Sequence, residues 1–159
     1  MHITALTQRT IILLLVIRQW LQILLAEQKI LRLVTMLENT GVGWSALLAN
    51  STGDSHTAFG YNALASVTTS TGNTAVGTNA GDAITTGASN CAVGYNCLTT
   101  LTTGSYNTAM GQDAANAMLG GSGNTAIGRN AGKDQTTGNY NVVIGHSAAA
   151  NNGPMTTGS

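Results

Sequence analysis

A short motif returns every 17 residues from position 39 onward, and this regularity constrains the fold more than any other feature. The motif is typified by residues 73–77, Asn-Thr-Ala-Val-Gly. Its copies follow one another without insertion or deletion, and they begin at Asn39, His56, Asn73, Asn90, Asn107, Asn124 and Asn141. A fixed spacing of this kind is typical of solenoids, in which units stack because no single unit can bury its own apolar face.

Several positions of the unit, numbered 1 to 17, keep one residue type. Position 5 is Gly in every copy, and position 8 is Ala in every copy except Cys97. Position 3 is small until Val143, and position 4 is always apolar. Positions 2 to 4 therefore predict a short strand, and the Gly that follows predicts a bend or a left-handed residue. A recurring Thr-Thr-Gly group predicts the closing turn.

These patterns predict an all-β repeat fold over residues 39–159, a parallel β-solenoid or β-roll of 17-residue coils. Stacking places position 4 of one coil over position 4 of the next, so we expect this column to form the structural core: Val42, Phe59, Val76, Val93, Met110, Ile127 and Ile144. The Asn residues at position 1 are expected to form an amide ladder. One sizeable apolar residue per coil is a thin core, so we expect self-association as a homotrimer.

Residues 1–38 share no visible motif with the repeats and form a separate segment. Residues 10–37 are rich in Leu, Ile and Val and contain no Gly or Pro, which predicts an apolar helix. Arg18 and Gln19 end the uninterrupted apolar run Ile11–Ile17, which is too short to span a membrane. No small-residue cleavage site follows, as a signal peptide requires. An amphipathic or coiled-coil helix fits better, and its contact with a membrane stays open.

The same segment has a second interpretation, namely repeat DNA translated in a shifted frame. If residues 29–37 were encoded by AAA ATA CTG CGG TTG GTT ACA ATG CTG, the frame starting at the third base would encode Asn-Thr-Ala-Val-Gly-Tyr-Asn-Ala, the repeat consensus. Codons with a central T encode apolar residues, so such a shift produces an apolar segment as a by-product. The coding DNA tests this hypothesis, because other codons at these positions would exclude it.

Charge and acidic residues exclude several functions. The net charge is zero and 8% of residues are charged, which argues against an electrostatic nucleic-acid binder. The four Asp residues of the repeats occupy four different positions of the unit, so they predict no calcium ladder: Asp54, Asp82, Asp113 and Asp134. We expect no enzymatic activity and no cofactor.

The His and Cys residues have simple interpretations. His56 and His146 occupy different columns, and we interpret each as a surface variant. Cys91 and Cys97 are interpreted as small, partly apolar fillers, with a disulfide or a metal site as the alternatives. The Gly-rich run at residues 120–123 is not followed by the Lys-Ser/Thr of a phosphate loop.

Position 6 varies in a way that suggests recognition. It directly follows the Gly of every copy and is rich in aromatic and long polar residues. As a displayed stripe it would comprise Trp44, Tyr61, Tyr95, Gln112, Arg129 and His146, with Thr78 as the small member. The alternatives are an exposed edge that tolerates any residue and a subunit contact. The recurring Thr pairs also raise an ice-binding solenoid as an alternative function, although adjacent Thr residues point to opposite faces of a strand.

Residues 56–64, His-Thr-Ala-Phe-Gly-Tyr-Asn-Ala-Leu, resemble the repeats of bacterial and phage tail-fibre-domain proteins. They are also similar to the head repeats of trimeric autotransporter adhesins. The resemblance covers residues 39 to about 153. It implies a trimeric β-roll in an extracellular fibre, on a virion or a bacterial surface, that contacts a glycan or protein receptor. The unit is longer than an adhesin-head repeat, and neither a membrane-anchor barrel nor a self-cleaving chaperone domain follows. We therefore expect a fragment of a longer fibre, or a chain that no longer functions.

Overall fold

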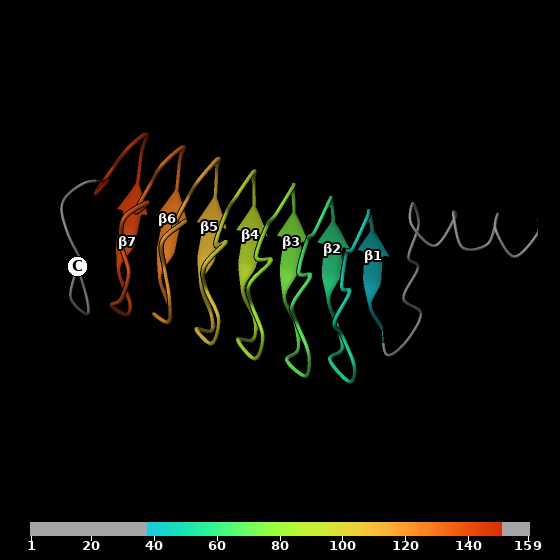
Figure 1. The fold of residues 1–159 in the computed structure, drawn as a ribbon. Helices are drawn as coiled ribbons and strands as arrows, with labels where there is room; N and C mark the ends of the chain where they lie inside the picture. The colour runs from blue at the N-terminus through green and yellow to red at the C-terminus, as the bar shows by residue number, and fades with distance from the viewer. Residues whose placement is uncertain (1–37, 151–159) are drawn as a thin grey trace, which may run out of the picture.

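The structure, a computed structural model, describes residues 38–150 and is an all-parallel β-solenoid. Seven three-residue strands lie side by side in sequence order (Figure 1). They are β1 (Thr40–Val42), β2 (Thr57–Phe59), β3 (Thr74–Val76), β4 (Cys91–Val93), β5 (Thr108–Met110), β6 (Thr125–Ile127) and β7 (Val142–Ile144). The predicted solenoid of 17-residue coils is thereby confirmed. The predicted N-terminal helix lies outside the described residues.

Every strand pairs with the next in strict 17-residue register. Ala75 lies opposite Ala92, and Val76 lies opposite Val93. The backbone hydrogen bonds run along the stack: the N–H of Thr74 donates to the carbonyl of Asn90 at 2.8 Å. The turns obey the same rule, since the N–H of Asn79 donates to the carbonyl of Tyr61 at 2.8 Å. A coil therefore depends on its neighbours for most of its backbone partners.

The core differs from the expected one, because position 3 and not position 4 points inward. The Ala residues at position 3 are buried on every strand from β2 to β6. Larger buried side chains come from positions 9 and 12, as with Leu64 and Ile84. The predicted core column is half-buried to exposed along its whole length: Val42, Phe59, Val76, Val93, Met110, Ile127 and Ile144. That column is aligned as predicted, but it faces outward.

The narrow cross-section of the coil explains this orientation. Side chains alternate between the two faces of a strand, so position 3 cannot share a face with positions 2 and 4. Ala at positions 3 and 8 leaves room for larger side chains only at positions 9 and 12, and a coil can fill both, as with Leu98 and Leu101. The interior is tightly packed around Gly81 at position 9, because a Cβ added there would lie 2.9 Å from Cδ1 of Ile84. A column of Phe, Met and Ile would not fit inside.

The Gly at position 5 is required by the stacking itself. All seven have a positive φ of 124° to 142°, which side chains rarely adopt. A Cβ on Gly94 would also lie 2.5 Å from the carbonyl oxygen of Gly111 in the next coil. The bend predicted at this Gly is confirmed, and its φ is positive in every coil. Leu64 and Leu98 at position 9 have a positive φ as well, near 50°, which no sequence pattern indicated.

Candidate functional site

The Asn residues of position 1 form a buried ladder along the solenoid, as predicted. Oδ1 of Asn90 accepts the backbone N–H of Asn107 at 2.9 Å and the side-chain amide of Asn107 at 3.1 Å. Nδ2 of Asn90 donates to the carbonyl of Gly104 at 2.9 Å. Each buried amide therefore satisfies one backbone carbonyl of its own coil and one backbone N–H of the following coil, which is why Asn recurs here.

His56 occupies one place in this ladder, which corrects its interpretation as a surface variant. The ring is buried, Nδ1 accepts the N–H of Asn73 at 3.1 Å, and Nε2 lies 2.9 Å from the carbonyl of Ser70. A neutral ring protonated at Nε2 thus performs both tasks of an Asn amide. Burial lowers the pKa of His56 from its usual value, while hydrogen bonds to Ser70 and Asn73 and the carboxylate of Asp54 oppose this change.

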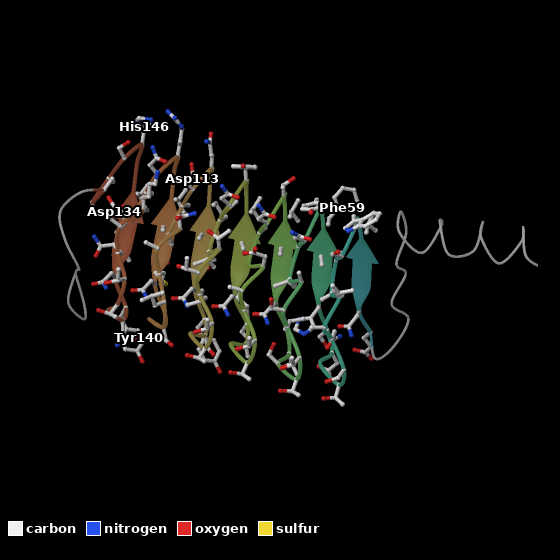
Figure 2. The ribbon with its side chains drawn as sticks, in the orientation of Figure 1. Phe59, Asp113, Asp134, Tyr140 and His146 are labelled. Atoms are coloured by element: carbon white, nitrogen blue, oxygen red, sulfur yellow. The ribbon has the colours of Figure 1, made fainter. Side chains whose placement is uncertain are left out.

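The position 6 residues stand on the turn that follows each strand. Figure 2 shows His146 at the arrowhead end of the strands and Tyr140 at the opposite end of the coil. Thr78 is half-buried, and the six residues predicted as a recognition stripe are all exposed: Trp44, Tyr61, Tyr95, Gln112, Arg129 and His146. Nη1 of Arg129 lies 3.3 Å from Nε2 of His146 in the next coil. The stripe therefore has an aromatic N-terminal half and a polar or charged C-terminal half.

The outer face of the sheet is a second exposed surface, which sequence reasoning did not identify. It consists of position 2, mostly Thr, and the apolar position 4. Phe59 is 57% exposed and Ile144 is 65% exposed. We call this surface the sheet face. The uniform smallness of position 3 was the sequence signal that could have placed position 4 outside.

The ionisable residues of the described part form no recognisable reactive site. No group of three or more His, Cys, Asp or Glu within residues 38–150 could hold a metal ion. Cys91 and Cys97 are free thiols. Burial raises the pKa of Cys97 to about 12, so this thiol stays protonated. Oδ1 of Asp82 is buried without a partner among the described residues, and burial raises the pKa of its carboxyl group.

The Thr pairs do not form a uniform array of free hydroxyl groups. In three pairs the first Thr bonds to the following coil: Oγ1 of Thr85 donates to the carbonyl of Thr102 at 3.1 Å, Thr68 does the same to Thr85 at 3.2 Å, and Thr102 does the same to Leu119 at 3.1 Å. The second Thr is exposed in four coils, as with Thr86. One hydroxyl of each of these three pairs is already engaged, which disfavours the ice-binding alternative.

Comparison with protein-family models, with curated proteins and with solved structures gives no match. Within residues 38–150, no helix is long and apolar enough to cross a membrane. The two exposed surfaces, the position 6 stripe and the sheet face, are the candidate functional sites.

Proposed function

We propose that this chain is a structural fibre module, comparable to an adhesin head, that presents a repetitive surface for attachment to a host cell or another surface. The observation that supports it best is the sheet face. Its apolar column runs over all seven strands, and soluble monomers rarely leave a long apolar surface in contact with water.

We propose that the sheet face packs against the sheet faces of two further copies of this chain, forming a homotrimer. Positions 2 and 4, which make up the sheet face, carry no charged side chain in any coil. Copies can therefore approach without burying an unpaired charge. The interior is built mainly from Ala, so burial within one chain contributes little stability. A closed ring of three copies would add the missing burial and leave no copy of the face exposed.

This arrangement suits a fibre outside the cell, on a virion or a bacterial surface. If the sheet faces meet around the fibre axis, the turns after the strands remain at the periphery. The six large residues of the position 6 stripe follow the strands and are exposed, and Figure 2 shows one of them, His146, at the arrowhead end of the strands. It is the surface that we propose for contact with a cell-surface glycan or protein receptor.

Sedimentation equilibrium of the protein and two Lys variants tests the trimer. Met110→Lys places a charge on the sheet face, where Met110 is exposed in the single chain. Thr103→Lys is the matched control, because Thr103 is exposed on the turn before the next strand. We expect a trimer for the parent and for Thr103→Lys, and a folded monomer or an aggregate for Met110→Lys. A stable, folded parent monomer would refute the proposal.

A further inference from the structure

We propose that Tyr61 and Tyr95 form a stacking platform for a neutral, β-1,4-linked chain of hexopyranose sugars. The proposal rests on the attachment function proposed above and names the chemistry of the ligand. Tyr61 is 51% exposed and Tyr95 is 52% exposed, and both belong to the aromatic half of the position 6 stripe.

The spacing of the two rings matches such a chain. They occupy the same position two coils apart, so they lie about 9.6 Å apart along the stack at about 4.8 Å per rung. An extended β-1,4-linked chain advances by about this distance every two sugars, and alternate sugars present equivalent faces. Thr78, the smaller residue between the rings, leaves room for the intervening sugar. Each stacked pyranose would direct its C–H groups at the electron-rich face of a tyrosine.

The two rings are held on a rigid backbone. The carbonyl of Tyr61 accepts the N–H of Asn79 at 2.8 Å, and the carbonyl of Tyr95 accepts the N–H of Asp113 at 2.9 Å. The preceding Gly60 is fixed in turn by its bond to the carbonyl of Val42 at 2.8 Å. The backbone that carries the two rings is already ordered and therefore loses little conformational entropy on binding.

The polar surroundings are neutral amides, which suit sugar hydroxyl groups. At position 7, Asn62, Asn79 and Asn96 directly follow Tyr61, Thr78 and Tyr95 and form a row. Nδ2 of Asn62 donates to Oδ1 of Asn79 at 3.3 Å, and Nδ2 of Asn79 donates to Oδ1 of Asn96 at 3.1 Å. At one end of the row the last donor is Nδ2 of Asn96, and at the other end the last acceptor is Oδ1 of Asn62. No charged residue occupies positions 6 or 7 from residue 44 to residue 96, so a neutral glycan fits better than a sulfated or sialylated one.

Isothermal titration calorimetry with cellohexaose and with chitohexaose tests the platform and separates glucose from N-acetylglucosamine chains. Maltohexaose, which is α-linked and curved, is the control ligand. The variants Tyr61→Thr and Tyr95→Thr introduce the residue that position 6 already holds at 78, so the repeat itself shows that the coil accepts them. Tyr106→Thr is the control variant, because Tyr106 is exposed at position 17 of its coil.

We expect at least one β-linked hexamer to bind, and each platform variant to weaken its binding by roughly tenfold or more. Tyr106→Thr should bind like the parent, and maltohexaose should not bind. No binding of either β-linked hexamer at millimolar concentration would overturn the proposal, as would binding that both platform variants leave unchanged. A trimer that binds no sugar would refute only the glycan platform, and a monomer that binds sugar would refute only the trimer.

Discussion

Replacing Asn107 by Ala should destabilise the solenoid through two buried backbone groups that lose their partners. Oδ1 of Asn107 accepts the N–H of Asn124 at 2.9 Å, and its Nδ2 donates to the carbonyl of Gly121 at 2.8 Å. Ala can replace neither contact. Leaving a buried polar group unsatisfied costs about 1–3 kcal/mol. Two such groups predict a loss of roughly 2–6 kcal/mol, a large part of the ~5–15 kcal/mol that typically stabilises a domain.

Urea unfolding at pH 8, followed by circular dichroism at one fixed protein concentration, measures this loss. His56→Asn is the matched control, because it restores the residue found in the other six copies and should change the free energy of unfolding by less than about 1 kcal/mol. A loss below about 1 kcal/mol for Asn107→Ala would mean that water or local rearrangement satisfies these groups. The ladder would then not be an important stabilising element.

Two further predictions concern the backbone and pH. Gly94→Ala places a Cβ 2.5 Å from the carbonyl oxygen of Gly111, at a φ of +142°. We expect the free energy of unfolding to fall by ~2–4 kcal/mol and the thermal midpoint to fall by several degrees. Gly120→Ala, which meets only Thr103 Oγ1 at 3.8 Å, is the control, and equal midpoints would contradict the clash. His56 has a lowered pKa in the folded chain, so its contribution is fully present above the unfolded value of about 6.5 and is lost as pH falls from there through the folded pKa. Urea unfolding at pH 8 and pH 5 should show a larger loss at pH 5 for the parent than for His56→Asn, and equal losses would contradict the role of the ring.

The sequence alone predicted the repeat, the register and the amide ladder. The absence of insertions made the 17-residue register unavoidable, and the column of Asn at position 1 predicted an amide ladder because stacked Asn residues form such ladders in cross-β assemblies. It also predicted a special backbone conformation at the invariant Gly. These features depend on period and residue type, which can be determined directly from the sequence.

The orientation of the strands could not be predicted from alternation alone. A three-residue strand has two solutions, with either position 3 or positions 2 and 4 inside, and hydrophobicity favoured the wrong one. The turn decides between them, since left-handed residues such as Leu64 and Leu98 direct the large side chains of position 9 inward. The role of His56 was missed for a related reason: its burial follows from the column it occupies and not from its residue type.

Distances between spin labels test most directly whether equivalent residues of successive coils lie one above another. Cys introduced at position 14, which is exposed in Thr52, Thr69 and Thr137, carries the labels away from the sheet face. Cys91→Thr and Cys97→Ala remove the native thiols with residues that other copies hold at the same positions. In samples diluted with unlabelled chain, we expect about 24 Å between labels at 52 and 137, five rungs apart, and about 19 Å between labels at 69 and 137, four rungs apart. Distances that do not shorten by about one rung between the two pairs would contradict the stacked solenoid.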